Sequence, residues 1–589
     1  GVMLTDVNPL FSGLISFIAL IAWWIIMFIT YWKLADHMSK YYQRQGISSP
    51  QPPVGLALAF CIMQTASIIP FIGGLLSLVG FVLWFIVVFQ LKASAIGIIN
   101  HKMQAEGVAE VEGAGQPYFQ FLSGGYNDKE LLAKLLRVGP EAAQYLEEKA
   151  GVKWKIIKNF PDYHHPHAPG TLEHGRYLEV EMFDGKDLGE WQPKVYSSPH
   201  MPLGITHDEL FSWGGLANIL LWDFNLMGSR IMADQRGFGP GMMAYFVKAA
   251  MIDREIPAYL NCPAVELVVE DGRVIGVKAS KDGEDFYVGA KDGVILGIGG
   301  YDWNQELAKY FEHLPEWQSM CLPHIDGDNI RLGSDAGAGH AGVPSFNLAM
   351  FFGFNIPGEE HDGKPLWRAS WEGGYPHAIW VNQAGERFCD ESFYRDYLPR
   401  TRQWDGCEQS QPNYPPYLIF DQNFRDKYPL ATYMPGQPVP EEVAVQADTL
   451  EGLAEKMGID PKTFVETVER FNTYAEDGVD PDFQRGRYPW ANMMIGDKNR
   501  KNPNLGPLNK APFYGMRLTP VGAGVNAVGL KTNEFAQVVH TRGQVIEGLY
   551  AVGNSAAVID TGAGYQSGIA NLRGMAWGYV AGRHAAGVK

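Results

Sequence analysis

The stretch at residues 548–582, close to the C-terminal end of the sequence, constrains the fold more than any other. A short apolar strand at 549–552 ends at Gly553-Asn554, and a glycine-rich loop leads to small and apolar residues at helical spacing over 569–580. In such a unit, the unpaired backbone N–H groups at the helix start point at an electron-rich ligand atom. The pattern therefore predicts a ligand site at this loop, with an ordinary buried strand and helix unit as the alternative.

Composition and charge exclude several classes of protein. The chain of 589 residues is 46% hydrophobic and has 67 glycines, which is typical of a loop-rich α/β protein. Its formal net charge is -17, and a body this acidic is unsuited to binding a phosphate backbone, so no nucleic-acid partner is expected. The 5 cysteines form no CxxC pair, which fits neither a disulfide framework nor a zinc site.

A histidine cluster at 164–174 invites a metal interpretation. It lies in a proline-rich stretch, PDYHHPHAPG, that predicts a loop. The cluster has neither the HxxxH spacing that places two ligands on one helix face nor a nearby cysteine. We therefore predict no metal site.

Two long uncharged runs lie near the start of the sequence. Residues 11–32 are uncharged and mostly apolar and end in a Tyr-Trp pair, which predicts a transmembrane helix. A second run at 54–91 is broken at Pro70, so two helices at 54–69 and 71–91 are expected, with a re-entrant hairpin as the alternative.

The basic residues near these runs set the predicted orientation. Lysine and arginine follow the first and the last predicted span, and positive charge favours the cytoplasmic side. We therefore expect a multi-pass membrane protein with membrane domain 1–103, linker 104–117 and a body on the cytoplasmic side.

The remaining sequence divides into three parts that differ in expected secondary structure and in composition. Residues 118–319 alternate strands and helices, include an Asp271-Gly272 hairpin signal, and contain a buried strand that ends at Gly299-Gly300. Residues 320–500 are rich in aromatics, prolines and short turns, which predicts an inserted domain. The alternation of strands and helices returns over 501–589.

Several motifs together resemble one flavoprotein family. They are GVILGIGGYDWN, the DGRVIGV hairpin, WVNQAGERF, VGLKTNEFAQVVHTRGQVIEGLYAVGN and GYQSGIANLRGMAWGYVAGRHAAG. In order and spacing they are similar to the family that includes 3-ketosteroid dehydrogenases and soluble fumarate reductases, over about residues 118–589. The segment PDYHHPHAPG, followed by GRYLE, resembles specifically the ketosteroid dehydrogenases of that family.

The resemblance implies a fold and a cofactor. It implies an α/β fold with a Rossmann-like FAD-binding domain in two segments, 118–319 and 501–589, and an inserted α+β substrate cap at 320–500. Transmembrane helices would precede this body. The FAD-binding residues implied are Ala264, Gly299, Gly300, Gly553, Asn554, Ile569, Ala570 and Asn571.

The resemblance also implies two catalytic residues. The backbone N–H of Gly568, at a helix start, would polarise a substrate carbonyl as an oxyanion-hole donor does. Tyr565 is the nearest tyrosine and would assist it, with a packed loop aromatic as the alternative role. The arginine that fumarate reductases carry beside this loop is absent, because Arg573 comes later, inside the predicted helix.

One expected unit is missing. Such flavoproteins begin with a strand, a GxGxxG loop and a helix, and the nearest match is GAGQPY at 113–118. It lacks a preceding apolar strand, has Tyr118 in place of the third glycine, and has Pro117 where a helix should start. Either FAD binds through the remaining segments, or another chain supplies the unit, or the body is a flavoprotein relic.

Our hypothesis from the sequence is a membrane-anchored, FAD-dependent oxidoreductase. It would introduce or reduce a C=C bond adjacent to a carbonyl in a hydrophobic, steroid-like substrate, with membrane lipid as a further partner. The alternative is a non-catalytic, degenerate flavoprotein-like subunit of a membrane protein assembly.

Overall fold

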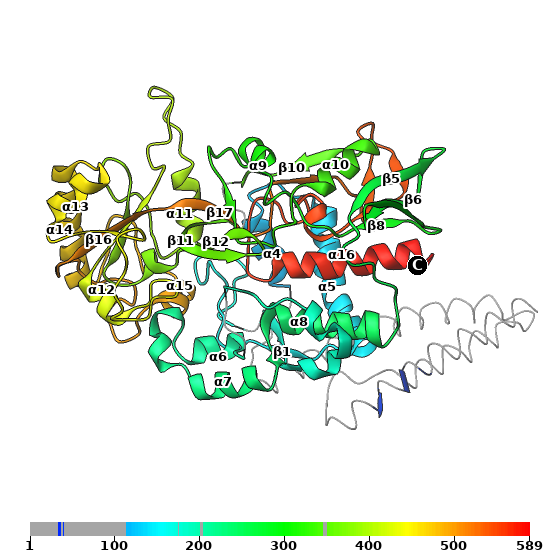
Figure 1. The fold of residues 1–589 in the computed structure, drawn as a ribbon, viewed down its shortest axis with the longest axis horizontal. Helices are drawn as coiled ribbons and strands as arrows, with labels where there is room; N and C mark the ends of the chain where they lie inside the picture. Colours follow the sequence, from blue (N-terminus) through cyan, green and yellow to red (C-terminus); the bar gives the residue numbers. More distant parts are fainter. Residues whose placement is uncertain are drawn as a thin grey trace, which may run out of the picture. The chain divides into compact units, whose positions relative to one another are not determined.

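The computed structural model describes residues 113–588, apart from 175, 201–203 and 346–349, together with five isolated residues between 33 and 40. By its internal contacts the chain divides into residues 1–110 and 111–589. All helices and strands with described bounds lie in the second unit, which has a mixed α/β fold (Figure 1).

A six-stranded sheet joins two distant parts of the chain. Its main path is β19-β20-β6-β5, with β7 beside β6 and β8 beside β20. At the hairpin between β5 and β6, Asp271 and Gly272 both have positive φ, as a two-residue hairpin turn requires, so this prediction is confirmed. The strands are β5 (Ala264–Glu270), β6 (Arg273–Lys281), β7 (Glu284–Gly289), β8 (Val294–Leu296), β19 (Gln537–Val539) and β20 (Val545–Ala551).

Two helices cover this sheet. Helix α5 (Lys129–Ala150) packs along α16 (Ile569–Ala585), and both contribute to one core with β20 (Figure 1). Leu135 of α5 and Trp577 of α16 are buried there against Tyr550. The amphipathic sequence of α5 explains its position, since its leucines share one face.

Two four-stranded sheets lie in and around the predicted cap, 320–500, and their strands β9, β16 and β17 fall outside those bounds. Strand β13 is completely buried, because both of its faces are covered. One sheet has the order β12-β11-β17-β9, from β9 (Gln318–Ser319), β11 (Met350–His361), β12 (Lys364–Ala369) and β17 (Thr519–Gly522). The other has the order β13-β14-β16-β15, from β13 (Ala378–Val381), β14 (Tyr417–Asp421), β15 (Val445–Ala447) and β16 (Phe513–Arg517).

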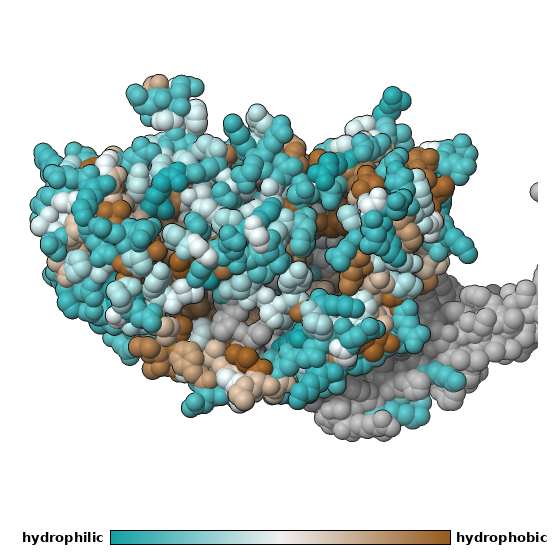
Figure 2. Space-filling model, viewed as in Figure 1, coloured by the Kyte–Doolittle hydropathy of each residue, from teal (hydrophilic) through white to brown (hydrophobic). Residues whose placement is uncertain are grey.

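Helices pack around the cap sheets. In Figure 1, α13 and α14 lie at the left edge, and Figure 2 shows mainly hydrophilic residues over them. The cap helices are α11 (Tyr394–Thr401), α12 (Gln422–Lys427), α13 (Leu450–Met457), α14 (Pro461–Asp477) and α15 (Pro489–Ile495).

A third region follows α5 in the sequence and precedes β5, the first strand of the six-stranded sheet. It exposes Leu220, Leu221 and Phe224 at η2 (Leu216–Leu221) and α7, where hydrophobic residues gather at the lower left of Figure 2. Its elements are β1 (Trp154–Ile156), β2 (Leu178–Val180), β3 (Phe183–Asp184), β4 (Gln235–Arg236), α6 (His207–Ser212), α7 (Phe224–Met232) and α8 (Phe238–Val247). Helices α9 (Gln305–Glu312) and α10 (Asp328–Asp335) and strands β10 (His340–Gly342) and β18 (Val528–Leu530) lie beyond β8 along the chain.

The GAGQPY segment enters a helix. Helix α4 (Gly115–Leu122) begins inside it, contrary to the expectation that Pro117 prevents a helix start. Proline is tolerated in the first turn, where its missing N–H would have no partner. The residues before 113 lie outside those described, so whether a strand precedes α4 stays a prediction.

The predicted localisation, a multi-pass membrane protein with a cytoplasmic body, is corrected. Within residues 113–588 as described, no helix is both long and apolar enough to cross a bilayer. The longest, α5, has 22 residues but carries charged side chains in nearly every turn, so it packs as an amphipathic helix. The three predicted spans, 11–32, 54–69 and 71–91, lie outside the described residues.

Candidate functional site

The parallel pairing of β8 with β20 brings two predicted loops together. Leu296 lies beside Ala551 at the carboxyl ends of these strands. Ser555, just after Gly553-Asn554, donates a hydrogen bond from its Oγ to the Gly299 carbonyl at 3.0 Å. The same Oγ accepts from the Ile298 N–H at 2.9 Å. The loops at Gly299-Gly300 and Gly553-Asn554, more than 250 residues apart in sequence, therefore meet at one edge.

The glycines at this edge differ in their surroundings. A Cβ on Gly553 would meet only the Gly574 Cα, at 3.6 Å, and a Cβ on Gly574 would meet no atom within 4 Å. A Cβ on Gly300 would instead collide with Asn526, whose Oδ1 accepts a hydrogen bond from the Tyr301 N–H. Gly553 thus leaves room for a ligand against its backbone, whereas Gly300 is required for packing.

Two buried amide oxygens at this edge have no partner. The Oδ1 atoms of Asn554 and Asn329 make no hydrogen bond to any described residue. The Asn329 amide nitrogen donates to the Ser555 carbonyl at 3.3 Å, which fixes that side chain beside the loop. Because an unsatisfied buried acceptor is costly, such atoms indicate a polar ligand that supplies donors.

Helix α16 presents its N-terminal end without a side-chain cap. Gly568 is its N-cap residue in the left-handed region, with φ +80, and a Cβ there would meet no atom within 4 Å. The Ile569 N–H donates to the Gln566 carbonyl at 3.2 Å, whereas the N–H groups of Ala570 and Asn571 have no partner inside the helix itself. The Ile569 side chain is buried in an apolar cluster with Tyr118, so neither its side chain nor its N–H faces a ligand.

Tyr565 lies in a buried group of three tyrosines. Tyr163, from the loop after β1, and Tyr394, the first residue of α11, pack with ring centroids 5.4 Å apart. The Cζ of Arg395 lies 3.7 Å from the centroid of the Tyr394 ring and 5.5 Å from that of Tyr565. The chain thus brings together aromatic side chains from three distant elements beside the start of α16.

Burial controls the protonation of these tyrosines. Burial raises the pKa of Tyr565, Tyr163 and Tyr394 above the usual value, and the nearby Arg395 guanidinium opposes the rise at each of them. At neutral pH all three hydroxyls are therefore protonated and can donate hydrogen bonds. Tyr565 is suited to donating to a carbonyl oxygen and unsuited to acting as a base.

Sequence reasoning missed Tyr163, Tyr394 and Arg395. Tyr163 lies within PDYHHPHAPG, the segment considered for its histidines, and no periodicity connects it with Tyr565. The other two lie in the stretch GGYPHAIWVNQAGERFCDESFYRDY, whose sequence predicts a strand, a turn at 382–385 and a second strand, whereas the structure has α11 at Tyr394–Thr401. Only the tertiary packing of the cap reveals this group.

A cavity of about 400 Å³ adjoins the tyrosines, since Arg395 forms part of its wall. His164 also lines it, between the rings of Phe393 and Tyr488. Burial lowers the pKa of His164 to about 4, so this imidazole is neutral and packs as an aromatic group. No set of three metal-ligating side chains occurs in the described ranges.

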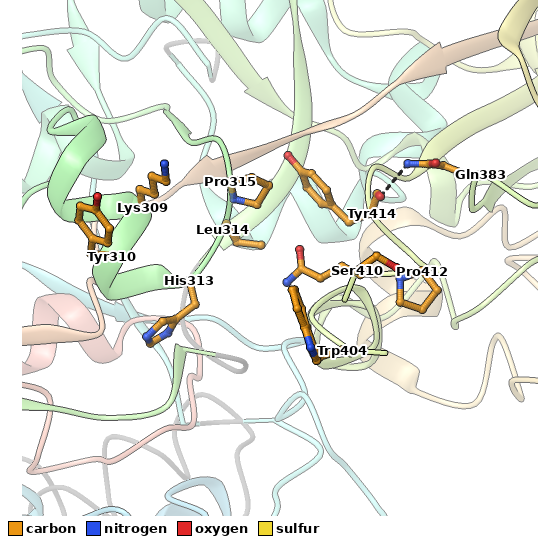
Figure 3. Close-up of a pocket in the computed structure, with 11 residues that line it drawn as sticks. Lys309, Tyr310, His313, Leu314, Pro315, Gln383, Trp404, Ser410, Pro412 and Tyr414 are labelled. Carbon is orange, nitrogen blue, oxygen red and sulfur yellow. Dashed lines mark hydrogen bonds between the residues drawn. The ribbon is translucent and has the colours of Figure 1, made fainter. Parts of the chain in front are cut away.

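A second hollow, of about 470 Å³, lies elsewhere. Figure 3 shows Tyr310, Lys309 and His313 on one side of it and Trp404 and Tyr414 on the other. None of the residues predicted from the sequence lines it. Ala264 is also apart from the tyrosines, because it begins β5 and packs against the sheet core; its implied role in binding FAD stays a prediction.

Buried hydrogen bonds among Asp560, Arg573 and Trp577, called the clamp below, join the Gly553 loop to α16. The Arg573 Nε donates to both carboxylate oxygens of Asp560 at 2.8 Å, and the Arg573 Nη1 donates to the Gly553 carbonyl at 3.2 Å. The Trp577 indole donates to the Asp560 Oδ2 at 2.6 Å. Arg573, inside the helix as the sequence predicts, therefore positions the loop by reaching back along the helix.

We predict that Trp577→Phe lowers the free energy of unfolding by about 1–3 kcal/mol, because the buried Asp560 carboxylate loses one donor. Urea unfolding followed by circular dichroism measures the change. Trp404→Phe is the control, since Trp404 is 57% exposed and should change stability by less than about 0.5 kcal/mol. Equal effects of the two variants would refute the role of the clamp.

Comparison with known proteins gives consistent matches. The family described as "FAD binding domain" matches residues 94–570. A 4-oxocyclohexanecarboxylate 2-dehydrogenase from Sinomonas cyclohexanicum is 32% identical, over 83% of this chain and 84% of that protein. A 3-oxosteroid 1-dehydrogenase from Mycolicibacterium smegmatis is 30% identical, over 77% of this chain and 83% of that protein.

Solved structures agree with the sequence matches. The 3-ketosteroid delta1-dehydrogenase from Sterolibacterium denitrificans, in complex with 1,4-androstadiene-3,17-dione, is 28% identical and superposes with a TM-score of 0.71. It covers 82% of this chain, and this chain covers 90% of it. A flavocytochrome c3 fumarate reductase, 20% identical with a TM-score of 0.51, shares the fold.

The residues at the β8 and β20 edge fit FAD. The open backbone at Gly553 and Gly568 and the unpartnered Oδ1 atoms of Asn554 and Asn329 suit a large polar cofactor that lies against the main chain. The chain belongs to the FAD binding domain family and is an FAD-dependent oxidoreductase of the ketosteroid dehydrogenase and fumarate reductase type, acting on carbon–carbon bonds.

Proposed function

We propose that the protein introduces or reduces a C=C bond adjacent to the carbonyl of a hydrophobic cyclic ketone. The observation that carries the proposal is the position of Tyr565, half-buried and protonated, in the loop that leads into the N-terminal end of α16. FAD, when bound, supplies the acceptor or donor of a hydride. The residues of this chain then have to hold the ketone and move one proton.

Gly568 and Tyr565 are the proposed electrophiles. The backbone N–H of Gly568 at the helix N-terminus favours negative charge that develops on a carbonyl oxygen. The Tyr565 hydroxyl donates a second hydrogen bond to the same oxygen. Together they make the hydrogen on the adjacent carbon more acidic, which is the requirement for removing it as a proton.

Tyr394 is the residue proposed to transfer the proton in dehydrogenation, and because its hydroxyl is protonated at rest, it has to release that proton to solvent before it takes the proton of the substrate. Burial raises its pKa, but the Arg395 guanidinium 3.7 Å from its ring centroid stabilises the phenolate form. Tyr163 packs against the Tyr394 ring and is a positioning residue for it. In the reverse direction Tyr394 would return the proton.

The substrate class is supported by the relatives. The wall of the cavity beside Arg395 includes the rings of Phe121, Phe393 and Tyr488 but also three aspartates and three arginines, so the cavity alone does not indicate an apolar ring system. The names of the two relatives, a 3-oxosteroid 1-dehydrogenase and a 4-oxocyclohexanecarboxylate 2-dehydrogenase, both describe cyclic ketones.

A dinucleotide-binding unit is proposed to pair with β8. In the described part of the chain β8 pairs only with β20, so its other edge is available to a further strand. Ile295 and Ile298 are each 41% exposed at this place, which is unusual because parallel sheets are normally covered. A strand, glycine loop and helix paired here would put a pyrophosphate site beside Gly299.

A dehydrogenation assay tests the proposal. The FAD-loaded protein is incubated with a saturated cyclic ketone and an artificial electron acceptor, and the product is analysed by mass spectrometry. We expect a product lighter by two hydrogens, with the new double bond adjacent to the carbonyl. If neither cyclic ketones nor the corresponding enones are converted, the proposed function is wrong.

A further inference from the structure

Building on the proposed function, we propose that Gln566 is a positioning residue for the proton transfer: its side chain fixes Tyr163, and through Tyr163 the ring of Tyr394. Gln566 stands in the loop between Tyr565 and Gly568, the two proposed electrophiles, and it is 1% exposed. The reaction as proposed above assigns no role to this side chain. Its contacts connect the loop before α16 with two segments that are distant in the sequence.

The amide oxygen of Gln566 accepts two hydrogen bonds. The Tyr163 N–H donates to Oε1 at 3.1 Å, and the Tyr118 hydroxyl donates to the same atom. Tyr118, in α4, is completely buried, and burial raises the pKa of its hydroxyl, which therefore stays protonated. Since both partners are donors, the atom that faces them has to be the amide oxygen. The orientation of the amide therefore follows from its hydrogen bonds.

The amide nitrogen of Gln566 has no comparable contact. Its Nε2 makes no hydrogen bond to any residue that the structure describes. The side chain therefore holds its neighbours only through its oxygen. A side chain of the same shape that keeps this oxygen and lacks the nitrogen should keep the positioning role, and glutamate has that shape.

Tyr163 is held to the loop before α16 at two points. Its N–H is bound by Gln566, and its hydroxyl is hydrogen-bonded to Ser567, the next residue. Its ring packs edge to face against the Tyr394 ring, with an interplanar angle of 77°. Because buried rings are closely packed, a shift of the Tyr163 backbone should displace the Tyr394 ring as well.

The backbone of Gln566 contributes to the position of the electrophile. Its carbonyl accepts the Ile569 N–H at 3.2 Å, and this bond closes the turn that contains Gly568. One residue thus contacts both the tyrosine that packs on Tyr394 and the turn that presents the Gly568 N–H. The spacing between these groups matters, because a misplacement of about 1 Å can reduce a rate about 100-fold.

Anaerobic stopped-flow measurement of flavin reduction by a saturated cyclic ketone tests the inference. Gln566→Met removes the acceptor, so we expect the limiting rate of reduction to fall at least about tenfold, with the dissociation constant of the ketone within about threefold. Gln566→Glu should retain at least about a third of the wild-type rate at pH 6, where burial keeps the new carboxyl protonated. Tyr118→Phe removes one of the two donors and should lower the rate less than Gln566→Met does.

Asn382→Leu is the control for loss of a buried amide oxygen. The Asn382 Oδ1 accepts from the N–H groups of Ala384 and Glu386, each at 3.0 Å, in the turn after β13. Urea unfolding should show a destabilisation similar to that of Gln566→Met, but the rate of flavin reduction should stay within about twofold of wild type. An unchanged rate in Gln566→Met, an equal loss of rate in Asn382→Leu, or a complete loss in folded Gln566→Glu would overturn the inference.

Amide hydrogen exchange separates this inference from the proposed function, because it requires no turnover. Exchange at the Tyr163 N–H, resolved by overlapping peptides, should be at least about tenfold faster in Gln566→Met and unchanged in Gln566→Glu. This result in a protein that converts no cyclic ketone would refute the proposed function and leave Gln566 as the residue that fixes Tyr163. Unchanged exchange in Gln566→Met would refute the positioning role whatever the activity.

Discussion

Gly568→Val is expected to reduce kcat at least about 100-fold, the loss typical when an oxyanion-hole donor is removed. Gly568 has φ +80, and a side chain there would project into open space beside the first turn of α16. The valine would shift the backbone N–H and occupy the room left for cofactor and substrate. Steady-state kinetics with a cyclic ketone measures the effect.

Gly363→Val provides the control for backbone strain. Gly363, in the turn between β11 and β12, has φ +75, and a Cβ there would also meet no atom within 4 Å. Both variants should lose a similar stability, about 1–2 kcal/mol, because valine is strained in the left-handed region. Only the Gly568 variant should lose activity, and a similar loss of kcat in both would show that strain alone is responsible.

Arg387→Met should lower the free energy of unfolding by about 3–5 kcal/mol, the cost of breaking a buried ion pair. The Arg387 guanidinium donates to Glu391 at 2.7 Å and to Asp480 at 2.9 Å, and its side chain is 1% exposed. Arg485 binds the other oxygen of Glu391 at 3.1 Å. Removing Arg387 leaves two buried carboxylates with one remaining cation, and chemical denaturation measures the loss.

The comparison for this prediction is Arg470→Met. Arg470 pairs with Asp482 at 3.2 Å, but its side chain is 52% exposed. Water compensates an exposed pair, so the expected loss is below about 1 kcal/mol. If the two variants were equally destabilised, the buried network around Glu391 would not be what stabilises the cap.

The central part of the fold could be predicted from local sequence. The Asp271-Gly272 hairpin depends on a turn of only two residues, and the strand before Gly553 depends on a short apolar run. Both form as predicted, because each is specified by neighbouring residues. The β8 strand that ends before Gly299 was predictable for the same reason.

The tyrosine group could not be predicted in this way. Tyr163, Tyr394 and Tyr565 are separated by more than 150 residues at each step, and they meet only because the cap packs against the loop before α16. Arg395 enters the group by its position on α11, where the sequence pattern indicates strands. Burial of Ile569 likewise follows from tertiary packing with Tyr118.

The anaerobic visible spectrum of the FAD-loaded wild-type protein tests the central claim most directly. If Gly568 and Tyr565 activate a ketone against the cofactor, adding a saturated cyclic ketone should bleach the oxidised flavin absorbance in the absence of oxygen. The bleaching should accompany formation of the enone. An oxidised spectrum that persists with every cyclic ketone, together with no reoxidation of the reduced flavin by the corresponding enones, would contradict the account.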